Sequence, residues 1–229
     1  MSKKAASTTT IIGHSDGPTS VWIGGREKPK DLKGYLRYLK QRRMNEKYKK
    51  KRTGIEKKLS AAPHTMDEVE AYIKEKYHAE EINAESDDTL RIRFSERREE
   101  CKAAMIQRFK PELIGRSLEI TPPDINDEES IKRVLDEADE IQRLAIAVPD
   151  EEFPLDYHLY YFMVPGKGEY YLEMEKNHSY LSGSYSSKKG KMKAMGKVDK
   201  DIFLFYGVSR QDIEEKSERY SMLVTVLAT

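Results

Sequence analysis

Two side chains suited to acid–base chemistry lie close together in the sequence, Asp156 and His158. Residues two apart on a β-strand project from the same face, so the carboxylate can orient the imidazole as in a general acid–base unit. No serine or cysteine in a recognised nucleophile motif accompanies the pair. We therefore interpret it as a hydrogen-bonded strand pair, with an enzyme of unknown class, its site near these two residues, as an alternative.

The other residue types that bind metals or cofactors form no recognised pattern. The five histidines and the single cysteine, Cys101, do not give a zinc spacing. The glycines match neither the phosphate-binding loop nor the dinucleotide fingerprint. We therefore expect no metal and no cofactor. Cys101 falls on an apolar helical stripe and is expected to be a buried, unreactive thiol.

Charge is strongly segregated along the chain, although the formal net charge is only +1. Arg26–Lys58 holds fifteen lysines and arginines against four acidic residues, a net +11. Lys110–Leu155 holds five against thirteen, a net −8. This asymmetry indicates a basic segment attached to a neutral or acidic body.

The basic segment has the periodicity of a helix over Asp31–Arg52. Leucines 32, 36 and 39 recur at helical spacing beside Tyr35 and Tyr38, and Gly54 is a plausible stop. Basic residues occupy the other faces. The candidate binding residues are Arg37, Lys40, Arg42, Arg43, Lys47, Lys50, Lys51 and Arg52.

Two interpretations of this helix have about equal support from the sequence. In the first it neutralises phosphates of RNA or DNA, and aromatic rings interleaved with arginine suit stacking on bases. In the second it is a solvated helix docked through its leucines, or resting on the chain's own acidic segment. Contact with an anionic membrane ranks third.

The segment Ile11–Ile23 reads IIGHSDGPTSVWI, in which Asp-Gly-Pro predicts a turn between two short apolar runs. It resembles the DGPT motif of the β subunits of sodium-translocating decarboxylases. These are membrane proteins that couple decarboxylation to sodium export. In that family the aspartate of the motif is implicated in sodium transport. The matching residues here are Asp16, Gly17, Pro18 and Thr19.

The resemblance covers about the first tenth of the chain. The many hydrophobic spans of that family are missing, so the resemblance does not imply transport. It implies, as an alternative function, an ion- or decarboxylase-associated accessory protein. The remainder of the chain resembles uncharacterised small soluble proteins of anaerobic Gram-positive bacteria that carry the same motif. A structural turn or docking arm is the interpretation we favour.

The rest of the sequence predicts the α+β class, with an antiparallel meander around residues 156–186 packed by amphipathic helices. Alternating Leu90, Ile92 and Phe94 predict a strand over Thr89–Ser95, and Ser117–Ile120 predicts a short one. Lys188–Lys200 reads as a loop, and Asp201–Val208 as a strand or short buried helix. Helices with N-terminal capping signals are expected over Met66–Tyr77, over Glu128–Ala147, and from Ser209 to about Ala228.

We expect an N-terminal arm over residues 1–25, a basic helical segment over 26–58 and an α+β globular domain over 59–229. The apolar runs are too short to span a bilayer, and a single cysteine is consistent with a reducing compartment. These features indicate a soluble, cytoplasmic protein. The predicted function is that of a small interaction or regulatory protein whose basic helix binds an acidic partner, with nucleic acid as the candidate.

Overall fold

The computed structural model describes residues 32–83, 85–115 and 127–228. It confirms the α+β class, with seven α-helices and a four-stranded antiparallel sheet in the described part of the chain. The helices are α1 (Leu32–Glu56), α2 (Met66–Tyr77), α3 (Asp88–Phe109), α4 (Glu128–Ala147), α5 (Met192–Tyr206), α6 (Arg210–Glu215) and α7 (Glu218–Ala228), with a 3-10 turn, η1 (Pro111–Ile114). The strands are β1 (Glu80–Glu81), β2 (Tyr157–Val164), β3 (Gly168–Glu175) and β4 (Tyr180–Ser187).

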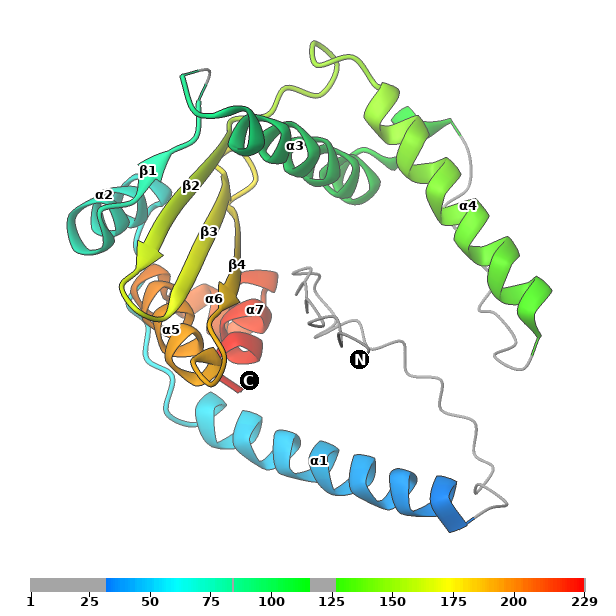
Figure 1. The fold of residues 1–229 in the computed structure, drawn as a ribbon, viewed down its shortest axis with the longest axis vertical. Helices are drawn as coiled ribbons and strands as arrows, with labels where there is room; N and C mark the ends of the chain where they lie inside the picture. The colour runs from blue at the N-terminus through cyan, green and yellow to red at the C-terminus, as the bar shows by residue number, and fades with distance from the viewer. Residues whose placement is uncertain (1–31, 84, 116–126, 229) are drawn as a thin grey trace, which may run out of the picture. The chain divides into compact units, whose positions relative to one another are not determined.

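The sheet has the strand order β1-β2-β3-β4, so consecutive strands are neighbours and the predicted meander is confirmed (Figure 1). In the short β1, Glu80 lies opposite Tyr161 of β2, and Glu81 lies opposite Tyr160. The aromatic residues of β2 and β3 supply much of the core. Tyr157, Tyr160, Phe162, Tyr170 and Tyr171 are all buried. Large buried rings contribute strongly to the apolar area removed from water.

The chain divides into two compact units. One contains α1, α2, α5, α6 and α7 with Phe162–Tyr171 and the part of β4 from Ser182 on. The other contains β1, α3, η1 and α4 with the remainder of β2 and β3 and the start of β4. The strands β2, β3 and β4 thus contribute residues to both units.

Helices with a strong N-terminal signal begin where the sequence predicts. Thr65 and Glu68 form a reciprocal capping box at the start of α2, and Asp127 caps α4. Ser209 and Asp212 form a second box at the start of α6. The C-terminal helix, expected to run unbroken to Ala228, is divided into α6 and α7 because Lys216 adopts a left-handed conformation.

The prediction of a strand over Thr89–Ser95 is wrong, because this stretch belongs to α3. The side chain of Asp87 accepts a hydrogen bond from the amide of Leu90 and caps this helix. The alternation of apolar and polar residues does not correspond to a buried face. Ile92, which a strand would bury, is 60% exposed.

Two further predictions are corrected. The stretch Lys188–Lys200 is not a loop throughout, since α5 begins at Met192 and continues through most of Asp201–Val208. Gly54 does not stop the basic helix, which continues to Glu56. The predicted strand Ser117–Ile120 and the N-terminal arm lie outside the described residues. Among the helices that the structure describes, none combines the length and apolar character that a bilayer span requires.

Candidate functional site

The C-terminal half of α1 packs against α7 of the same unit. Asn45, Tyr48, Arg52 and Ile55 are partly buried and recur at steps of three or four residues, which places them on one side of the helix. Arg52 and Glu56 lie close enough to Tyr220 of α7 to affect its titration. Packing therefore fixes one side of α1 and leaves the others exposed.

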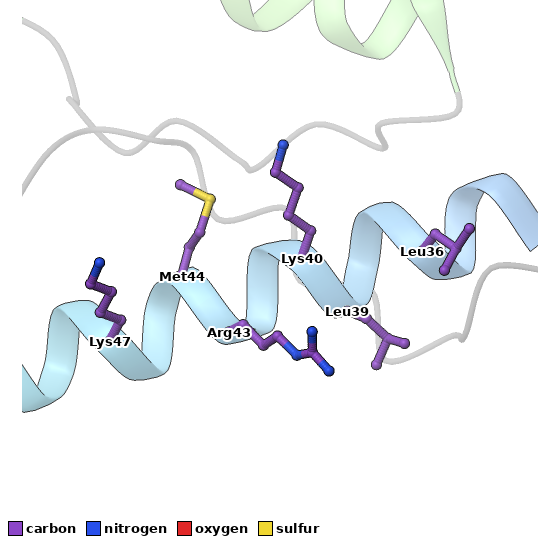
Figure 2. A pocket seen from close by; sticks show the side chains of 6 residues that line it. All are labelled: Leu36, Leu39, Lys40, Arg43, Met44 and Lys47. Carbon is purple, nitrogen blue, oxygen red and sulfur yellow. The ribbon is translucent and has the colours of Figure 1, made fainter.

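The exposed side carries five cations, which we call the α1 basic face: Lys40, Arg43, Lys47, Lys50 and Lys51. With 3.6 residues per turn, positions spaced by 3, 7, 10 and 11 from the first fall on one side of a helix. The face spans eleven residue steps, or about 16 Å at 1.5 Å per residue. Figure 2 shows three of these side chains along the helix.

Two cations of α1 lie outside this face and have partners on the same helix. Arg42 Nε lies 3.1 Å from Glu46 Oε1, and Arg52 Nε lies 3.0 Å from Glu56 Oε1. Within the described residues no ion pair holds a member of the α1 basic face. The acidic residues of α1 therefore do not neutralise the positive charge of the α1 basic face. The side chain of Arg37 lies outside the described part of the structure.

Apolar side chains are mixed with the cations. Leu36, Leu39 and Met44 line a shallow hollow together with Lys40, Arg43 and Lys47 (Figure 2). Leu36 is 58% exposed and Met44 is 55% exposed. A helix that lies on a membrane separates its apolar and basic residues onto opposite faces, and this helix does not.

Two tyrosines lie on the side of α1 that faces away from the α1 basic face. The rings of Tyr35 and Tyr38 stack on each other with centroids 6.5 Å apart and planes inclined by 25°. Both side chains are exposed. The rings therefore do not belong to the surface that the five cations form.

The pair Asp156 and His158 meets as the sequence predicts. His158 Nε2 lies 2.9 Å from Asp156 Oδ1, and His158 Nδ1 lies 2.6 Å from Glu81 Oε1 on the neighbouring strand. A carboxylate thus occupies each ring nitrogen, so neither nitrogen is directed at an open site. The two carboxylates lie at opposite edges of the ring and do not converge on one metal ion. No cluster suited to a metal occurs among the described residues.

Glu81 was not identified from the sequence, because a two-residue strand leaves no periodic signal. The arrangement joins β1 to β2. The same kind of contact holds the turn between β3 and β4, where buried Glu175 accepts hydrogen bonds from the backbone amide and Nδ1 of His178, each at 2.8 Å. His158 therefore links β1 to β2, and His178 holds the turn between β3 and β4.

Cys101 is buried, as predicted. Burial and the neighbouring carboxylates of Glu173 and Glu175 raise the pKa of its thiol well above the ordinary value. A thiol that resists ionisation is a poor nucleophile at neutral pH. Cys101 thus packs as a small apolar side chain.

The segment that resembles the decarboxylase motif, Asp16, Gly17, Pro18 and Thr19, lies outside the described residues. Its role as an ion site or as a turn stays a prediction. Comparison of the chain with known protein families, with curated proteins and with solved structures finds no match.

Proposed function

We propose that this protein binds nucleic acid through the α1 basic face, without reading base sequence. The observation that supports the proposal is the exposure of five cations on one side of a helix, none of them in an ion pair with a described residue. Neutralising phosphates releases the counterions condensed around a nucleic acid, and this release is the main source of sequence-independent affinity.

Nucleic acid fits this face better than the other acidic partners. A row of cations about 16 Å long matches a polymer whose charges repeat at a regular distance. Four of the five cations are lysines, which bind phosphate as point charges and not through the bidentate fork of arginine, so we expect no preference for sequence.

The test is the salt dependence of binding to a fluorescent duplex of arbitrary sequence, measured by anisotropy between 50 and 200 mM salt. Five phosphate contacts contribute about −4.5 to the slope of log Kobs against log salt concentration, at −0.9 per contact. The variant Lys40→Gln/Arg43→Gln/Lys47→Gln should lose about 2.7 of that slope and about tenfold or more in affinity.

A charge-matched control lies on α4 of the other unit, where Lys132, Arg133 and Arg143 are exposed. Replacing these three by glutamine changes the net charge equally and should leave the salt slope unaltered. Binding that ignores salt, or that survives unchanged in the α1 variant, would remove the proposal. Salt-dependent capture of an acidic protein with no affinity for RNA or DNA would also do so.

A further inference from the structure

A second row of lysines lies on α5, in the stretch that the sequence suggested was a loop. Lys193, Lys197 and Lys200 are spaced by four and three residues and so share one side of the helix. Lys193 and Lys197 are exposed, and Lys200 is partly buried. The row is about 10 Å long at 1.5 Å per residue.

The acidic residues of α5 are bound to other elements. The hydroxyl of Tyr170 on β3 donates to Asp199 Oδ1 at 2.6 Å. Asp201 accepts hydrogen bonds from residues of α2: Tyr72 and Tyr77 at 2.6 Å each, and Lys76 at 2.7 Å. No described residue forms an ion pair with any of the three lysines. The row therefore keeps its positive charge.

A glycine makes the first of these contacts possible. A Cβ atom at Gly183 on β4 would overlap the hydroxyl of Tyr170 and crowd Asp199. The absence of a side chain there lets α5 approach the sheet with Asp199 turned inward. The lysine row is consequently fixed by the packing of α5.

The helices α1 and α5 both pack against α7, and this packing brings Lys51 of α1 near Lys200 of α5. Burial, the charge of Lys200 and the charge of Lys47 together lower the pKa of the Lys51 ammonium. Lys200 Nζ also donates to the carbonyl of Leu227 in α7 at 3.3 Å. Like charges held close together on two helices that pack against α7 repel, and an anion between them would relieve that repulsion.

We propose that the nucleic-acid interface continues from α1 onto α5, with a backbone phosphate bound between Lys51 and Lys200. This inference rests on the proposed function of the α1 basic face. Lys193 and Lys197 add two phosphate contacts to the five of α1, and Lys200 shares its phosphate with Lys51.

The experiment compares the wild type with Lys193→Gln/Lys197→Gln on the same 24-base-pair duplex. Both substituted side chains are exposed, so the fold should be retained, and circular dichroism checks it. We expect the salt slope to lose about 1.8, at 0.9 per contact. The matched control is Lys132→Gln/Arg133→Gln on α4, which removes the same charge and should leave the slope unaltered.

The outcomes separate the two proposals. A slope unchanged in the α5 variant but reduced in the α1 variant would overturn the extension and leave the proposed function standing. A slope reduced equally by the α5 variant and its α4 control would also overturn the extension, because it would reflect net charge alone. No binding by the wild type at 50 mM salt would overturn both proposals.

Discussion

Replacement of Arg97 by methionine is expected to lower the free energy of unfolding by about 3–5 kcal/mol, the range observed when one partner of a buried ion pair is removed. Arg97 Nε lies 2.9 Å from Glu173 Oε1, and a second guanidinium nitrogen contacts the same oxygen. Glu173 is 2% exposed. Without the arginine, its carboxylate would stay buried with no counter-charge.

Substitution of the other partner, Glu173, should lower the free energy of unfolding by less. Glu173→Gln leaves Arg97, which is more exposed than its partner and also pairs with Glu100 at 2.7 Å. The charge that remains can therefore be compensated. Arg97→Met/Glu173→Met should restore most of the lost stability, since replacing both members of a buried pair by apolar groups is often neutral or stabilising.

The measurement is urea denaturation of the wild type, Arg97→Met, Glu173→Met and the double variant, analysed as a double-mutant cycle, with Glu173→Gln measured beside them. Burial raises the pKa of Glu173, and Arg97 opposes that rise. The stability of Arg97→Met should therefore recover as the pH falls, because protonation removes the buried charge. A loss below about 1 kcal/mol in Arg97→Met would contradict a stabilising role for the pair.

The sequence predicted best the elements whose ends carry local signals. The capping residues before α2 and α4 act over a few residues and can be read without knowing the fold. The prediction failed at α3, where alternation over Thr89–Ser95 suggested a strand. The cap at Asp87 and the helical stripe that follows, which includes buried Met105, decide the conformation instead.

The helix α5 shows why local signals are sometimes absent. No side chain caps its start at Lys191, and Gly196 lies inside it. Its stability comes from tertiary packing, since Met195, Val198 and Ile202 are buried. Tertiary packing is not visible in a propensity pattern.

The candidate site likewise has features that the sequence predicts and features that depend on tertiary packing. The α1 basic face follows from helical spacing alone, and so do the pairings of Arg42 and Arg52 with glutamates four residues on. The approach of Lys200 to Lys51 could not be predicted, because it depends on how α1 and α5 pack within their unit. The contact of Glu81 with His158 depends in the same way on strand pairing.

The stability of the wild type relative to Asp199→Asn should fall by about 3 kcal/mol as the pH rises from below 3.8 to above 6. Burial raises the pKa of Asp199 from 3.8 to about 6, although the Tyr170 hydroxyl and Lys200 oppose the rise. A group that binds its proton more tightly when folded contributes most below its unfolded pKa. That contribution is lost as the pH passes through the folded pKa.

The measurement is the free energy of unfolding from urea denaturation at a series of pH values. Taking the difference between wild type and variant cancels the titration of all other groups. Asparagine keeps an oxygen that accepts from Tyr170, so packing should be preserved. Asp201, two residues along the same helix, gives a control of opposite sign. Burial raises its pKa, but hydrogen bonds from Lys76, Tyr72 and Tyr77 outweigh burial and leave the pKa lowered.

The wild type should therefore have a higher free energy of unfolding than Asp201→Asn above pH 3.8. This difference should disappear as the pH falls below that value. A flat difference for Asp199→Asn would mean that water reaches this carboxylate. In that case Asp199 would ionise as freely as a surface residue, and its negative charge would lie beside Lys200.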